Sequence, residues 1–155
     1  MERKDIIEHL RAAKSAHIKW VQKAKLLING LHVEEDNIPV DATECKFGKW
    51  FYSEGQILNS LSNIPSEEIE SIEELHSKLH DEYLEIFNIY FNKSKASFLC
   101  KIFGLKRRNI SDEEHESARN FYNNLEIISK DLLKEINILE KKLIEVSEEE
   151  IKKLL

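Results

Sequence analysis

Apolar residues recur at alternating spacings of three and four along most of this chain, and this periodicity limits its fold more than any other feature. Such spacing places the apolar side chains on one face of an α-helix. It predicts long helices over residues 5 to about 33, Pro65 to about Asn92, and Ser111 to the C-terminus. The aromatic-rich segment from Glu44 to about Ser53 is predicted to form one or two further turns, and Gly55 to Pro65 a loop.

Two of these helices have recognisable beginnings. Pro65 is followed by a serine and two glutamates, which favour the first turn of a helix, and Ser111 and Glu114 have the spacing of a capping box. The last helix would hold about 40 residues and span roughly 60 Å. Because it is longer than the first helix, its final turns are expected either to fray or to pack on another subunit.

Amphipathic helices must bury their apolar faces against one another. Low glycine and proline contents, 4 and 2 among 155 residues, suit long helices. We therefore predict an all-α fold, namely an antiparallel four-helix bundle with short connecting helices and a long C-terminal helix. Residues 1–110 would form the core of the bundle. Residues 111–155 would complete it and offer a surface for dimerisation.

Charge and hydropathy exclude several classes of protein. The net charge of -6 supplies no dominant basic face, which argues against nucleic-acid binding. No apolar run approaches the 18 or so residues of a membrane span, and the N-terminus does not resemble a signal peptide. We expect a cytoplasmic protein.

Three histidines lie on the helical faces that should be apolar. His17 interrupts the first apolar stripe and His76 the second, while His80 follows His76 by one turn on the same face. Cys45 opens the aromatic segment Cys45-Lys46-Phe47-Gly48-Lys49-Trp50-Phe51. One cysteine and three histidines form a complete tetrahedral ligand set for zinc. Core histidines that bond to other protein groups are the alternative, and the pattern alone leaves both interpretations open.

Three motifs together resemble the chemoreceptor zinc-binding (CZB) domain family. They are His17-x-x-Trp20, Cys45-x-Phe47-Gly48-x-Trp50-Phe51 and His76-x-x-x-His80, and the similarity covers about residues 9 to 90. The resemblance implies a bacterial cytoplasmic four-helix bundle that binds Zn²⁺ through His17, Cys45, His76 and His80. It also implies a homodimer, and a chemoreceptor or a diguanylate cyclase as signalling partner.

Four protein ligands leave no open coordination position, so such a site is regulatory or structural and the chain is not expected to be an enzyme. The Cys45 thiolate would be the oxidisable ligand. The prediction is a sensor of zinc availability or of an oxidant such as hypochlorous acid, in chemotaxis or second-messenger signalling. Two alternatives stay open: a non-haem di-iron helical bundle, for which Glu73-x-x-His76 occurs once without a second copy, and a metal-free dimerisation adaptor.

Several neighbouring residues have secondary expectations. Gly48 would permit a close approach or a bend, and the aromatic residues Trp20, Phe47, Trp50 and Phe51 would pack around the site. His9 lies beside the first stripe rather than in it, and His32 near a helix end. Cys100 lies in an apolar segment with basic residues, 98–108, which would pack on the bundle or contact an acidic partner or a membrane surface.

Overall fold

The computed structural model describes residues 2–31, 33, 41–91 and 110–154, and within these ranges it contains helices and no strand. The all-α class is therefore confirmed. The elements are α1 (Arg3–Ile28), α2 (Lys46–Phe51), the 3₁₀ helix η1 (Glu54–Ser60), α3 (Ser66–Phe91), α6 (Asp112–Glu145) and α7 (Glu148–Lys153). The stretch predicted as a loop after Gly55 thus contains a 3₁₀ helix.

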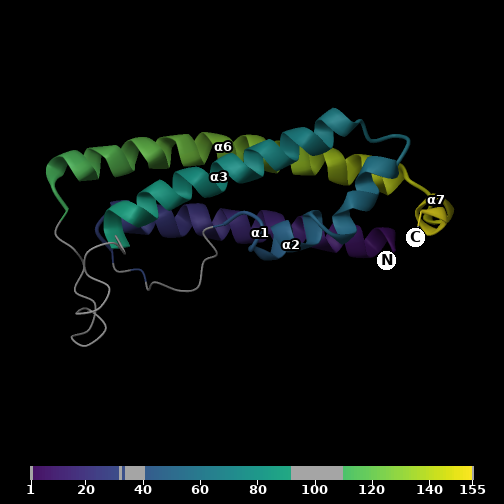
Figure 1. Ribbon diagram of the computed structural model, residues 1–155, viewed down its shortest axis with the longest axis horizontal. Coiled ribbons are helices and arrows are strands. Elements are labelled where there is room, and N and C mark those ends of the chain that lie inside the picture. Colours follow the sequence, from purple (N-terminus) through teal and green to yellow (C-terminus); the bar gives the residue numbers. More distant parts are fainter. Residues whose placement is uncertain (1, 32, 34–40, 92–109, 155) are drawn as a thin grey trace.

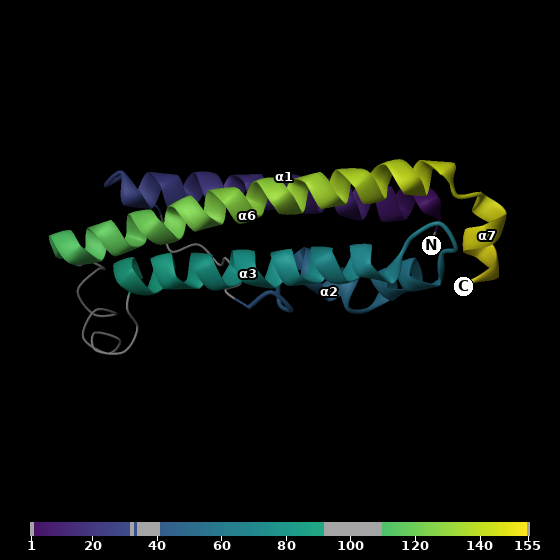
Figure 2. The ribbon, with the colours of Figure 1, turned by 90° about the horizontal axis from the view of Figure 1, so that it is seen from above.

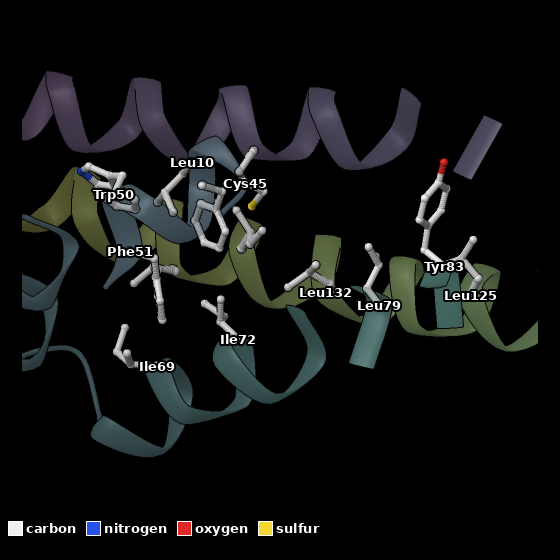
Figure 3. Packing of buried hydrophobic residues seen from close by; sticks show 14 of the residues in the cluster. Leu10, Cys45, Trp50, Phe51, Ile69, Ile72, Leu79, Tyr83, Leu125 and Leu132 are labelled. Carbon is white, nitrogen blue, oxygen red and sulfur yellow. The ribbon is translucent and has the colours of Figure 1, made fainter. Parts of the chain in front are cut away.

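Three long helices run side by side (Figures 1 and 2). Helix α6 packs against both α1 and α3 and runs opposite to them, while α2 packs against α1 and leads into η1. Leucine and isoleucine side chains fill the space between the long helices, as Figure 3 shows for Leu10, Ile72, Leu79 and Leu132. Each is fully buried and stabilises the fold by about 1.5–3 kcal/mol relative to exposure.

Helix α1 ends earlier than the periodicity predicts. Gly30 has a φ of 83°, a left-handed conformation that glycine adopts without steric cost. Its N–H bonds to the Leu27 carbonyl and the Leu31 N–H to the Leu26 carbonyl, which is the Schellman arrangement that terminates helices. Leu31, which continues the apolar stripe in sequence, is consequently 54% exposed.

The C-terminal segment is not one continuous helix. Val146 takes an extended conformation after α6, and the Ser147 side chain caps α7 by accepting a hydrogen bond from the Glu150 N–H. Ile151 is fully buried in the same core as the long helices, and the Arg3 guanidinium donates to the Val146 carbonyl. The last turns therefore fold onto the end of their own chain's bundle, as Figure 1 shows, instead of extending beyond it.

In the described part of the chain, no helix combines the length and the apolar character needed to cross a bilayer. In that part of the chain, the main packing of helix on helix is that of α6 against α1 and α3. The arrangement of four helices stays a prediction. His32, Cys100 and the segment 98–108 lie outside the described residues.

Candidate metal centre

The structure brings together the four residues that the sequence analysis singled out. His17 comes from α1, Cys45 directly precedes α2, and His76 and His80 are one turn apart on α3. One nitrogen or sulfur atom from each lies within 4.8 Å of those of the other three, and all four side chains are buried. A tetrahedral zinc ion holds its nitrogen and sulfur ligands about 3.3–3.8 Å apart, so the donors that are furthest apart would approach each other by about 1 Å to bind one.

A close contact within this tetrad joins the thiol to α3. Cys45 Sγ lies 3.3 Å from His76 Nε2. The ring centroids of His76 and His80 are 4.7 Å apart, and those of His17 and His76 are 5.0 Å apart. Three segments that are distant in sequence therefore converge on one point.

Cys45 is held by the first turn of α2. Its sulfur accepts a hydrogen bond from the Gly48 N–H at 3.1 Å, and its carbonyl accepts one from the Lys49 N–H. Burial raises the pKa of the Cys45 thiol, and the N–H groups of Gly48 and Phe47 oppose that shift. A bound cation would favour the thiolate far more strongly, because it places positive charge directly on the sulfur.

Gly48 is required for space rather than for an unusual backbone angle. A Cβ atom at this position would lie 1.8 Å from the Ala42 carbonyl oxygen. The close approach expected for Gly48 is therefore present, but its partner is the preceding turn and not a neighbouring helix. That turn is closed by the Asp41 carboxylate, which accepts hydrogen bonds from the Thr43 N–H and hydroxyl at 2.8 and 2.7 Å.

This turn and its role in placing Cys45 were not predicted from the sequence. An aspartate followed two residues later by threonine is a known local signal, because the carboxylate can cap the backbone of the turn. Applied to Asp41 and Thr43, it would have predicted a structured approach to Cys45.

His17 and His76 are in the protonation state that metal binding needs. Burial, together with the nearby His80, lowers the pKa of His17 to about 4, although the Ala13 carbonyl opposes the shift. Burial and the neighbouring His17 and His80 lower the pKa of His76 to about 2. These imidazoles are neutral at pH 7, so a ring nitrogen has a lone pair available for a metal ion.

Aromatic side chains enclose the tetrad. The Trp20 ring meets His80 edge-on at a centroid distance of 4.6 Å, and Phe47 meets His76 in the same way at 4.9 Å. Trp50 packs against Phe47 and stacks on the exposed His9 ring at 4.8 Å with an interplanar angle of 9°. His9 thus covers a tryptophan and is not a member of the tetrad.

The donor atoms themselves show that a metal ion fits. The buried Nδ1 atoms of His17 and His76 have no hydrogen-bond partner of normal geometry, and such buried groups are usually satisfied. Three nitrogens and one sulfur form a soft donor set that suits zinc. No carboxylate belongs to the cluster among the described residues, and Glu73 is exposed, which disfavours the di-iron alternative.

The fold and the tetrad define a helical protein with a buried His₃Cys site at the junction of three segments. Residues 17–87 match the family model of the chemoreceptor zinc-binding domain. The matched part of the chain contains the whole tetrad, and the resemblance to this family that the motifs indicated is confirmed. No curated protein and no solved structure matches the chain significantly.

Proposed function

We propose that this chain is a zinc-dependent sensory domain in which His17, Cys45, His76 and His80 hold one Zn²⁺. The observation that carries the proposal is the convergence of four buried donor atoms within 4.8 Å, in a segment that matches a zinc-binding family. Four protein donors leave no position for a substrate or a reactive water molecule. The proposed role is therefore regulatory and not enzymatic.

Metal binding would act on the relative positions of helices. The tetrad links α1, the turn before α2, and α3, so its free energy of metal binding is also free energy of folding for this region. Loss of the metal would leave buried imidazoles near one another and release the clamp. In the proposed arrangement the chain forms an antiparallel four-helix bundle with short connecting helices, and a cytoplasmic homodimer passes the change to a chemoreceptor or a diguanylate cyclase.

Cys45 is the proposed switch, because it is the oxidisable member of the tetrad. With hypochlorous acid, the thiolate would gain an oxygen atom to become sulfenic acid, while the oxidant is reduced to chloride. The oxidised sulfur binds metal more weakly than a thiolate does. The same tetrad could instead report zinc availability directly, through gain and loss of the ion.

Metal analysis and zinc affinity of three variants test the proposal. Cys45→Ser and His80→Ala should each lower zinc affinity by more than about 100-fold, since removal of supporting residues alone costs 10- to 100-fold. His9→Ala is the matched control, because His9 is exposed and outside the tetrad. The parent protein should be colourless with one zinc per chain.

Three results would contradict the proposal. Iron with visible absorbance would favour the di-iron alternative. A melting temperature unchanged by chelation would favour the metal-free adaptor. If oxidant releases zinc from Cys45→Ser as readily as from the parent, the redox switch is refuted. Sensing of zinc availability would then be the part of the proposal that still stands.

A further inference from the structure

A groove between α1 and α2 leads from the surface to one side of the tetrad. Its volume is about 690 Å³. Cys45 and His17 line it, whereas His76 and His80 do not. The two histidines of α3 thus lie on the side away from the groove, and the sulfur lies on the side toward it.

Small side chains keep this groove open along α1. Ala12 and Ala16 are exposed, lie one helical turn apart and line the groove opposite the α2 segment. Larger residues at these positions would project into the space between the two helices. Figure 3 shows Cys45 directly beneath α1, which places the sulfur close to this wall.

Trp20 lies where the groove meets the histidines. It is half-buried, lines the groove, and its ring meets His80 at 4.6 Å and His17 at 5.4 Å. Its bulk therefore narrows the groove beside His17. A smaller residue here would widen the passage.

We propose that the α1–α2 groove is the route by which small uncharged thiol-reactive molecules reach Cys45, and that Trp20 and Ala16 set the width of this route. Cys45 is only 3% exposed, so a reagent needs a passage or an opening of the fold. Lys46, Lys49 and Glu54 also line the groove. The walls contributed by Ala12, Ala16, Phe47 and Trp50 are apolar, which favours an uncharged solute there because a charged one would lose hydration.

This proposal deepens the redox part of the proposed function, but it concerns the thiol and not the ion. It is therefore tested on the metal-free chain with iodoacetamide, a small uncharged reagent. The Cys45 thiolate displaces iodide, so that a carbon–sulfur bond replaces the carbon–iodine bond. Peptide mass spectrometry then measures the modified fraction of Cys45 separately from that of Cys100.

Ala16→Leu should slow the modification of Cys45 about tenfold, because the reagent must displace part of a leucine side chain buried in the groove. Trp20→Ala should accelerate it by a similar factor. Ser15→Leu is the matched control, since Ser15 is exposed on α1 and does not line the groove. Ala12→Leu and Trp20→Phe replace the first two variants if either fails to fold.

Equal rates in Ala16→Leu, Ser15→Leu and the parent would overturn the proposal. So would a parent rate that rises steeply in low urea, because it would show that Cys45 is reached by opening of the fold. If the parent binds no zinc but Ala16→Leu still slows the modification of Cys45, the zinc function is refuted and the groove is not. Normal zinc binding without that effect would refute the groove alone.

Discussion

Replacing Gly48 by alanine should damage the metal centre without touching a ligand. The added Cβ would lie 1.8 Å from the Ala42 carbonyl oxygen, whereas such contacts are essentially never shorter than 3.0 Å. The turn and α2 must therefore separate by at least about 1.2 Å, because packed backbone cannot absorb the overlap. Metal–ligand distances tolerate only about 0.2 Å.

The displaced segment carries Cys45, whose sulfur accepts the Gly48 N–H. We expect Gly48→Ala to lower zinc affinity by about 100-fold, at the upper end of what supporting residues contribute. Overpacking should also destabilise the metal-free protein by about 1–3 kcal/mol. Helix propensity opposes this by up to about 1 kcal/mol, since alanine favours helix more than glycine does.

Competition with a chromogenic chelator measures the affinity, and urea unfolding of the metal-free protein measures the stability. Gly55→Ala is the matched control: its Cβ would lie 3.1 Å from the Trp50 carbonyl oxygen, a contact that small shifts relieve. If Gly48→Ala binds zinc as tightly as Gly55→Ala and the parent, the turn does not position Cys45 and the reasoning is wrong.

Three further predictions concern the stability of the fold. Because the pKa values of His17 and His76 lie at about 4 and about 2, below the unfolded value of 6.5, the unfolded metal-free chain binds more protons below that pH. The free energy of unfolding of the metal-free chain should be constant above about pH 7. It should fall by up to about 1.4 kcal/mol per pH unit for each histidine as the pH drops from 6.5 toward 4. Equal urea midpoints at pH 7 and pH 5 would contradict this prediction. Glu140→Ala should lower the free energy of unfolding by about 1–3 kcal/mol, because the buried Glu140 carboxylate accepts hydrogen bonds from Arg11 and Lys14 at 2.6 Å each. An unchanged urea midpoint would mean that these ion pairs contribute nothing to stability. Ile151→Ala should lower the free energy of unfolding by about 2–5 kcal/mol, because Ile151 is buried against the bundle of its own chain. A melting temperature equal to the parent's would show that α7 does not pack there.

The sequence predicted the helices well wherever a local rule governs them. Apolar spacing predicted the extents of α3 and most of α1, and the Ser111 capping box begins α6 as expected. The errors lie at helix ends. Apolar periodicity continues through Leu31 and the last helix was predicted to run to the C-terminus, but the left-handed Gly30 and the extended Val146 turn the chain there. Gly30 was a readable signal for a helix end. Ser147 and Glu150 likewise have the Ser-x-x-Glu spacing that starts a new helix, and the burial of Ile151 against the bundle end favours the break.

The sequence by itself determined which side chains are available for the site. Histidines on apolar stripes and a cysteine in a family motif identify the donors, and the i, i+4 spacing of His76 and His80 fixes that pair through helix geometry alone. Only the tertiary structure decided that His17 and Cys45 meet this pair within 4.8 Å. It also decided that a groove reaches Cys45 from one side, and that Ala42 leaves room for no residue but glycine at position 48. These features depend on the packing of segments far apart in sequence, which no local pattern encodes.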